Sequence, residues 1–191
     1  AFATRMRSFG PSRIIAYDPF VPQTVADLLG VQLVSLEELL TESDYVSIHT
    51  SLTTETRHLI NEKTLKLMKP TAMLVNTSRG PVIDGQALFC ALQEKTIEAA
   101  ALDVTEVEPI ESADPLLSLS NVIVTPHLAG FSPTFLDECP IRQAENVIRV
   151  LTGSAPWGLA NPEAIKTIAI MRNREDLRWK DIPDFKTSIN L

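Results

Sequence analysis

The chain has 191 residues, of which 45% are hydrophobic and 21% are charged, and its formal net charge is -7. This length suits one domain with a substantial core, or one domain with an appendage. The acidic balance and the lack of a basic run argue against nucleic acid as a direct partner. No apolar segment of the sequence is long enough to span a bilayer, so no membrane partner is expected.

The termini and the cysteines indicate the compartment. Cys90 and Cys139 lie in apolar helical patterns without CxxC spacing, and we expect both to be buried free thiols. The first residues lack the pattern of a signal peptide, so we expect a cytoplasmic protein. The chain opens without Met in a segment typical of a helix already under way, which predicts a fragment of a longer protein.

The first part of the chain is predicted to alternate short helices and strands. Glycine ends two of the helices, at Gly10 and Gly30. The expected helices cover residues 2–9, 25–29 and 36–40. The expected strands cover residues 13–17, 31–34 and 45–49, and the Thr-rich loop 50–56 follows the last of them.

The second part continues the alternation with longer helices. Asp84 is predicted to cap a helix, and Ser132 followed by Pro133 is predicted to begin a long helix that ends before Gly153. Helices are expected around residues 65–68, 85–92 and 133–151, and strands at 72–75, 97–104 and 122–124. An apolar helical stripe covers residues 164–171, and residues 172–191 are charged and irregular.

Six strands alternate with helices, and no hairpin signal separates them. This pattern predicts an α/β fold with a parallel sheet. In such sheets ligands bind beyond the carboxyl ends of the strands. Arg79, Glu108 and His127 each follow a predicted strand and Asp103 lies at the end of one, so we expect them to converge at one edge.

Asp18 ends the first predicted strand. An acidic residue at the end of the second strand of a dinucleotide-binding unit binds the ribose hydroxyls, about 20 residues after the glycine fingerprint. That count from Asp18 reaches back beyond residue 1, so we expect the first strand and the glycine loop to be missing. No Arg follows Asp18 to accept a 2′-phosphate, which favours NAD over NADP. The spacing alone leaves open an ordinary Asp18-Pro19 turn.

The order and spacing of five motifs resemble the NAD-dependent D-isomer-specific 2-hydroxyacid dehydrogenases. The resemblance covers roughly residues 5–153. The motifs are Ile-Ile-Ala-Tyr-Asp-Pro at 14–19, His-Thr-Ser-Leu-Thr at 49–53, Leu-Met-Lys-Pro-Thr-Ala-Met-Leu-Val-Asn-Thr-Ser-Arg-Gly-Pro-Val-Ile-Asp at 67–84, Ala-Leu-Asp-Val-Thr-Glu-Val-Glu-Pro at 101–109, and Thr-Pro-His-Leu-Ala-Gly at 125–130.

The resemblance implies a Rossmann-like, doubly wound parallel sheet with a C-terminal helical extension. It implies an NAD-binding domain over residues 1–131, incomplete at its N-terminus, and a long return helix with a C-terminal segment over 132–191 that belongs to a substrate domain. It also implies a homodimer. The implied catalytic residues are Arg79, Glu108 and His127, and the implied cofactor-binding residues are Asp18, His49, Thr50, Thr77, Ser78, Asp103 and Gly130.

The residue types suit hydride transfer between NAD(H) and a 2-keto or D-2-hydroxy acid. The planar guanidinium of Arg79 suits a substrate carboxylate. The imidazole of His127 suits proton transfer, and Glu108 would orient that imidazole. Asp103 would orient the nicotinamide amide. No Cys, His or carboxylate cluster has metal-ligand spacing, so no metal is expected.

Each of these residues also has a structural interpretation. Without the family motif, His127 would be an ordinary loop histidine, and Arg79 would only cap the helix that partners the preceding strand. Glu106 competes with Glu108 as the partner of the imidazole; we select Glu108 because Pro follows it, as in the family motif. We expect His49 and His58 to be structural, with His49 near the cofactor.

Three positions depart from the family pattern. Lys95 stands where a helix-terminating Gly is common, at a cost of up to about 1 kcal/mol. Phe131 is bulky for its place after Leu-Ala-Gly. Pro140 lies inside the long predicted helix, where it costs about 3 kcal/mol unless the helix kinks.

Two alternatives to a dehydrogenase remain open at this point. The first is a non-catalytic, NAD-sensing module, because relatives of this family serve as transcriptional corepressors. The second is an inactive truncated fragment.

Overall fold

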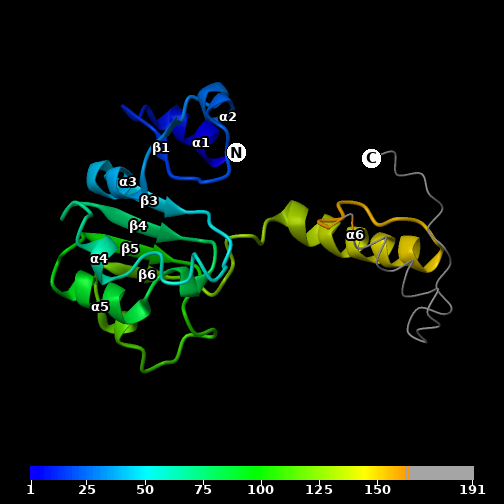
Figure 1. Cartoon of the computed structure of the whole chain (residues 1–191). Coiled ribbons are helices and arrows are strands. Elements are labelled where there is room, and N and C mark those ends of the chain that lie inside the picture. Colours follow the sequence, from blue (N-terminus) through cyan, green and yellow to red (C-terminus); the bar gives the residue numbers. More distant parts are fainter. Residues whose placement is uncertain (162, 164–191) are drawn as a thin grey trace. The chain divides into compact units, whose positions relative to one another are not determined.

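A computed structural model describes residues 1–161 and 163 (Figure 1). Two compact units make up the chain, residues 1–129 and 130–191. The helical stripe predicted over residues 164–171 and the irregular segment 172–191 lie outside the described residues. In the described part, no helix is long and apolar enough to cross a membrane.

The first unit contains six parallel strands in two groups. β1 (Ile15–Ala16) pairs with β2 (Gln32–Leu33), and the second group has the order β3-β4-β5-β6. The bounds of this group are Tyr45–Ile48, Met73–Asn76, Ala99–Leu102 and Val122–Val124. The predicted number of strands and the parallel α/β fold are therefore confirmed, although four of the strands are shorter than predicted.

Helices separate the strands, as the alternation predicted (Figure 1). The α-helices of the first unit are α1 (Phe2–Met6), α2 (Gln23–Leu28), α3 (Leu36–Glu42), α4 (Glu62–Leu65) and α5 (Gly85–Gln93). The 3-10 helices are η1 (Arg7–Phe9), η2 (Gly80–Val82) and η3 (Pro115–Ser118). The helix predicted over residues 2–9 thus changes from α to 3-10 geometry at Arg7 and ends at Gly10, whose φ of 69° is left-handed.

The core lies on one face of the β3–β6 sheet. Alternate strand residues are buried, and they pack with side chains from α4 and α5, including Leu65, Leu88 and Leu92. The opposite face is only half covered: Tyr45 remains 73% exposed and Ile123 67% exposed. The two faces of this sheet thus differ in how much apolar surface they bury.

Local capping follows the predicted chemistry. The Asp84 carboxylate accepts a hydrogen bond from the backbone N–H of Ala87 at 3.0 Å and begins α5. After α5 the chain reverses at Lys95, whose φ of 59° confirms that a glycine-like conformation is imposed on a lysine.

The described part of the second unit contains the helix α6 (Pro133–Leu151). As predicted, Ser132 caps the helix through the Phe135 N–H, and the chain leaves it at Gly153, whose φ is 78°. Pro140 lies inside the helix, and no residue of α6 is buried. Near the C-terminal end the Arg149 guanidinium lies 4.5 Å from the centre of the Trp157 ring.

The cysteine prediction is half right. Cys90 and Cys139 are both free thiols. They are partly exposed rather than buried, because Cys90 lies on the flank of α5 and α6 buries none of its residues.

Candidate functional site

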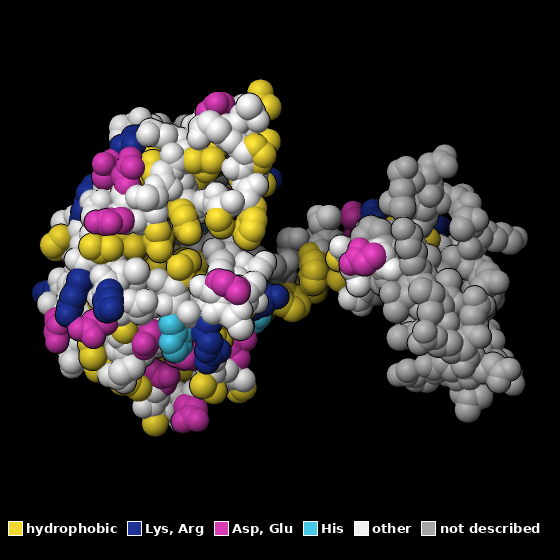
Figure 2. Space-filling model, in the orientation of Figure 1, with side chains coloured by type: hydrophobic (Ala, Val, Ile, Leu, Met, Phe, Trp, Pro, Cys, Tyr) yellow, Lys and Arg dark blue, Asp and Glu magenta, His cyan; other side chains and the backbone are white. Residues whose placement is uncertain are grey.

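Three loops at the carboxyl ends of neighbouring strands carry the predicted chemistry. β4, β5 and β6 are adjacent and parallel, so the segments after Asn76, Leu102 and Val124 leave the sheet at the same edge. Figure 2 shows histidine beside acidic and basic side chains on part of the surface of this unit.

Asp103 is the buried anchor of the loop after β6. Only 6% of the residue is exposed. One carboxylate oxygen accepts hydrogen bonds from the Thr125 hydroxyl at 2.6 Å and the Leu128 N–H at 2.8 Å, and the other accepts one from the Ala129 N–H at 2.8 Å. Both oxygens are therefore occupied in holding the loop that carries His127.

These contacts explain the ionisation of Asp103. Burial raises the pKa of this carboxyl, but the hydrogen bonds from Thr125, Ala129 and Leu128, with the nearby His127 charge, lower the pKa below its ordinary value overall. Charge-assisted hydrogen bonds of this kind are stronger than neutral ones. The predicted contact of Asp103 with the nicotinamide stays a prediction.

Glu108 and His127 form a pair. Glu108 Oε2 lies 3.0 Å from His127 Nδ1, and Glu108 Oε1 accepts the Thr105 N–H at 3.1 Å. An ionised carboxylate is only an acceptor, so Nδ1 must carry the hydrogen, and Nε2 has no hydrogen-bond partner within the described residues. The backbone fixes the imidazole as well: His127 has a φ of 56°, and its N–H donates to the Asp103 carbonyl at 2.9 Å.

The neighbouring carboxylate, Glu106, has another partner. Its Oε1 lies 2.6 Å from His58 Nε2, and its Oε2 accepts the Gly85 N–H at 3.0 Å. The geometry therefore separates the two candidates that the sequence offered for the imidazole of His127, and it places Glu108 there.

Arg79 stands in a turn organised by a fully buried Asn76. The Asn76 side-chain oxygen accepts from the Ser78 N–H and hydroxyl, both at 3.0 Å, and its amide donates to the Arg79 carbonyl at 3.0 Å. The exposed Arg79 guanidinium donates to the Ser78 carbonyl at 2.6 Å. Thr77, which lies between Asn76 and Ser78, is exposed. Among the described residues no hydrogen bond or ion pair joins Arg79 to Glu108 or His127.

Gly80 brings the loops after β4 and β5 together. A Cβ atom on Gly80 would lie 1.7 Å from the Thr105 carbonyl oxygen and 2.1 Å from its carbon. Only glycine permits this approach of the two backbones. The turn that carries Arg79 is thus packed directly against the loop that carries Glu108.

The predicted adenosine end of the site involves Asp18 and the loop after β3. The Asp18 Oδ1 atom accepts the N–H groups of Phe20 at 2.8 Å and Val21 at 3.1 Å, so the residue does form the turn that was weighed as an alternative. The other carboxylate oxygen has no hydrogen bond within the described residues. A ribose contact is therefore compatible with the turn.

His49 and Thr50 follow β3. His49 Nε2 lies 3.0 Å from the Ser47 hydroxyl, and its ring centre is 4.7 Å from that of Phe2. Burial, followed by the charge of the N-terminal amine, lowers the pKa of His49. Thr50 is half-buried at the start of the loop. Gly130 belongs to the second unit, and its cofactor contact stays a prediction.

Sequence reasoning missed two residues that organise this edge. Asn76 shapes the Arg79 turn, and the Thr125 hydroxyl helps to fix Asp103. Both follow or end an apolar strand run, which is where Asn and Thr side chains commonly bond to nearby backbone. In the described part of the chain, no group of three or more His, Cys, Asp or Glu residues could hold a metal ion.

The residues present fit part of a dinucleotide. Asp18 offers a carboxylate oxygen at the end of β1, and residues 19–22 contain no cation for a 2′-phosphate. The described residues contain no glycine-rich loop between a strand and a helix for a pyrophosphate. Asp18 could therefore hold the ribose of NAD, whereas a contact of the nicotinamide with Asp103 stays a prediction.

Comparison with known proteins finds relatives named as dehydrogenases or reductases of small acids. The chain is 48% identical to a glyoxylate reductase of Korarchaeum cryptofilum over 166 residues, which cover 87% of this chain and 50% of that protein. It is 42% identical to a D-3-phosphoglycerate dehydrogenase of Methanocaldococcus jannaschii over 158 residues, 82% of this chain and 30% of that protein.

A solved structure agrees with these sequences. The D-lactate dehydrogenase with NAD+ from Lactobacillus jensenii matches with a TM-score of 0.68 and 29% identity, over 76% of this chain and 47% of that one. The chain thus spans at most about half the length of these relatives.

The family described as "D-isomer specific 2-hydroxyacid dehydrogenase, NAD binding domain" matches residues 1–129, which are the first compact unit. The fold, the strand-end loops and the relatives agree: the chain belongs to the NAD-binding domain family of the D-isomer-specific 2-hydroxyacid dehydrogenases.

Proposed function

We propose that the chain carries the proton-transfer half of an NAD-dependent reductase of small 2-keto acids, with glyoxylate as the first substrate to test. The observation that supports this most strongly is the 3.0 Å approach of Glu108 to His127 at the carboxyl end of a parallel sheet. The family's cofactor is NAD, and several relatives are glyoxylate reductases.

His127 would hold and deliver the proton. Glu108 accepts the Nδ1 hydrogen, so Nε2 is the nitrogen that donates to the keto oxygen in reduction and accepts from the hydroxyl in oxidation. Asp103 keeps the loop in place while the charge on the ring changes.

Arg79 would bind the substrate carboxylate. One nitrogen of its exposed guanidinium donates to the carbonyl of the preceding residue, Ser78. Its other N–H groups are left for a bidentate contact with the substrate carboxylate. Asn76 and Gly80 fix the turn that presents it. NADH, when bound, supplies the hydride, and Asp18 would accept a ribose hydroxyl.

We also propose that a longer form of the protein completes the sheet. In the doubly wound order, the strand that leads into the glycine loop lies between the positions of β1 and β3. Within the described residues these two strands belong to separate hydrogen-bonded groups. A strand between them would bring a pyrophosphate-binding loop to the same edge as Asp18.

The remaining half of the active site would also exclude water. The side chains of His127 and Glu108 are 51% and 39% exposed, which weakens their interaction by solvent screening. A substrate domain corresponding to the rest of the relatives would cover them, and residues 132–191 would belong to it. Closing such a site strengthens its electrostatic interactions.

The assembly and location are proposed on the family resemblance. We propose a homodimer, which size-exclusion chromatography with light scattering would test at several protein concentrations. We propose a cytoplasmic location, and the two free thiols are typical of a reducing compartment.

A chimera tests the function directly. Residues 1–161 would replace the matching half of the Korarchaeum cryptofilum glyoxylate reductase, and NADH oxidation would be measured with glyoxylate, hydroxypyruvate and a bulkier keto acid. Turnover that requires both NADH and a keto acid supports the proposal. A folded chimera that binds NADH without turnover would instead support the non-catalytic, NAD-sensing alternative.

A further inference from the structure

The loop after β5 carries two carboxylates, and each lies against an imidazole. Glu108 lies against His127, whereas Glu106 Oε1 lies 2.6 Å from His58 Nε2. Glu106 Oε2 also accepts the Gly85 N–H at 3.0 Å, at the start of α5. The Glu106 contacts therefore join the loop to two segments that are distant in sequence, the turn at His58 and the helix α5.

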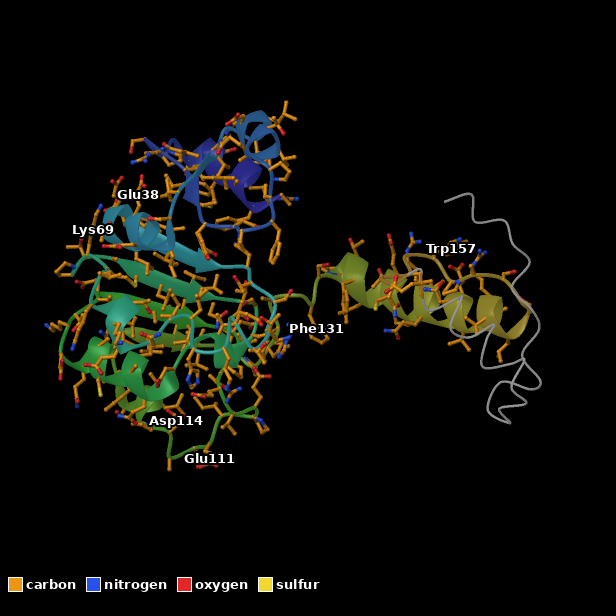
Figure 3. All side chains as sticks on the ribbon, in the orientation of Figure 1. Glu38, Lys69, Glu111, Asp114, Phe131 and Trp157 are labelled. Carbon is orange, nitrogen blue, oxygen red and sulfur yellow. The ribbon has the colours of Figure 1, made fainter. Side chains whose placement is uncertain are left out.

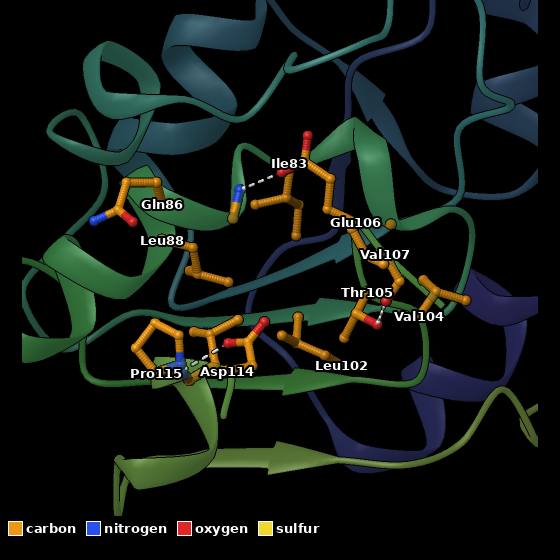
Figure 4. Close-up of a pocket in the computed structure, with 13 residues that line it drawn as sticks. Ile83, Gln86, Leu88, Leu102, Val104, Thr105, Glu106, Val107, Asp114 and Pro115 are labelled. Atoms are coloured by element: carbon orange, nitrogen blue, oxygen red, sulfur yellow. Dashed lines mark hydrogen bonds between the residues drawn. The ribbon is translucent and has the colours of Figure 1, made fainter. Parts of the chain in front are cut away.

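Val104, which is 2% exposed, attaches the start of the loop 104–109 to the apolar core, and the middle of the loop has no buried apolar side chain. A hollow lies beneath it, between the start of α5 and η3 (Figure 4). Its walls include Ile83, Leu88, Leu102, Val104 and Leu116. Within the loop, Val107 remains 62% exposed. Beyond Val104 and the close approach of Gly80 to Thr105, the polar contacts of Glu106 attach the loop on this side.

Apart from the contact between Glu108 and His127, the side-chain hydrogen bonds of Thr105 and Glu108 stay within the loop. The Thr105 N–H donates to Glu108 Oε1 at 3.1 Å, and the Thr105 hydroxyl donates to the Val107 carbonyl at 2.8 Å. Both bonds are internal to the loop. These bonds fix Glu108 relative to the rest of the loop. The place of the loop in the fold therefore depends on contacts with other segments.

The charges around Glu106 favour its ionised form. Burial raises its pKa, but the hydrogen bonds from His58 and Gly85 and the charge of His58 lower the pKa overall, against the opposing charge of Asp84. Arg57 Nη2 lies 3.8 Å from Glu106 Oε1, and Asp84 Oδ2 lies 4.0 Å from His58 Nδ1. A carboxylate with these partners is a strong acceptor at neutral pH.

We propose that Glu106, held by His58 and the Gly85 N–H, is a positioning residue that fixes the loop 104–109 and so holds Glu108 against His127. The importance of that pair rests on the function proposed above. The contacts of Glu106 act on the loop alone: they touch neither His127 nor the loop after β6, which Asp103 holds separately.

The test uses nuclear magnetic resonance on the chain itself, without cofactor or substrate. Glu106→Ala should accelerate hydrogen exchange of the Thr105 amide at least tenfold and alter the 15N signal of His127 Nδ1. Glu106→Gln keeps an acceptor for the Gly85 N–H and should return the exchange rate to within about threefold of the wild type. Glu111→Ala is the matched control, because Glu111 is an exposed acidic residue that follows the same loop (Figure 3); it should leave both signals unchanged.

A second variant removes the partner of Glu106 in this contact, the imidazole of His58. His58 has a φ of 51°, a conformation that Asn tolerates well, so His58→Asn removes the ring with little backbone strain. It should accelerate Thr105 exchange to a similar extent, and the double variant with Glu106→Ala should add little. This variant also serves if Glu106→Ala fails to fold.

The outcome is independent of catalysis. If the folded Glu106→Ala or His58→Asn protein loses global stability while the Thr105 and His127 signals stay at their wild-type positions and rates, the pair only stabilises the fold and the inference is wrong. A chimera that lacks reductase activity would overturn the proposed function and leave this result standing.

Discussion

Gly80→Ala is the sharpest test of how the loops are packed. A Cβ atom at this position would lie 1.7 Å from the Thr105 carbonyl oxygen, whereas real contacts of this kind are essentially never below 3.0 Å. The two backbones must therefore separate by about 1.3 Å, the difference between these distances. Gly80 lies in the turn after β4 and the Thr105 carbonyl in the backbone of the loop after β5, so neither partner is a side chain that can rotate away.

The expected cost follows from this displacement. Overpacking typically destabilises a protein by about 1–3 kcal/mol, and a contact between two backbone segments belongs at the upper end, so we expect a loss of about 2–3 kcal/mol in the free energy of unfolding. The Thr105 amide should move as well, because the shift begins at its own peptide group. In the chimera, displacement of Glu108 by about 1 Å should lower turnover on the order of 100-fold.

Urea unfolding followed by far-ultraviolet circular dichroism measures the stability, and the amide spectrum reports the shift. The control for stability is Gly130→Ala, because a Cβ there meets no atom within 4 Å among the described residues. It should change the free energy of unfolding by less than about 0.5 kcal/mol. A Gly80→Ala protein within that same limit, with an unmoved Thr105 signal, would refute the packing of the two loops.

Three further outcomes follow from single residues. Asp103→Asn replaces one acceptor oxygen by an NH₂ group and leaves a backbone N–H of the 125–129 loop unpaired, so denaturant unfolding should show a loss of about 1–3 kcal/mol. Folding lowers the pKa of Asp103, so the carboxylate stabilises the fold above its unfolded pKa of about 3.9, and this stabilisation is lost as the pH falls below that value. The free energy of unfolding should therefore fall less steeply with decreasing pH in Asp103→Asn than in the wild type. An unchanged slope would contradict this. Lys95 has a φ of 59°, so Lys95→Gly should raise the free energy of unfolding by about 1 kcal/mol. Lys63→Gly, inside α4, should lower it by a similar amount. A change of the same sign in both variants would contradict the backbone argument.

Local chemistry made much of the fold predictable. The Asp84 and Ser132 caps, the turns at Gly10 and Gly153, and the left-handed Lys95 position are each determined within a few residues of sequence. The strand alternation likewise predicted a parallel sheet. The cysteines show the limit of this reasoning, because helical periodicity predicts which face is apolar and does not predict whether that face is covered.

The site was predictable only where a motif specified it. Pro109 distinguished Glu108 from Glu106 in the sequence, and the structure places Glu108 beside His127. The part of Asp103 in holding the His127 loop depends on contacts 22 to 26 residues apart, which no local pattern contains. The approach of Gly80 to Thr105 likewise depends on the packing of two strands.

The central claim is that His127 transfers the proton, and His127→Asn in the chimera tests it most directly. Asn accepts the φ of 56° at this position, so the loop conformation should persist. If His127 transfers the proton, kcat/KM for glyoxylate with NADH should fall by at least about 100-fold, while the NADH dissociation constant should change by less than about threefold. Turnover that survives the substitution, or NADH binding that is lost together with turnover, would contradict it.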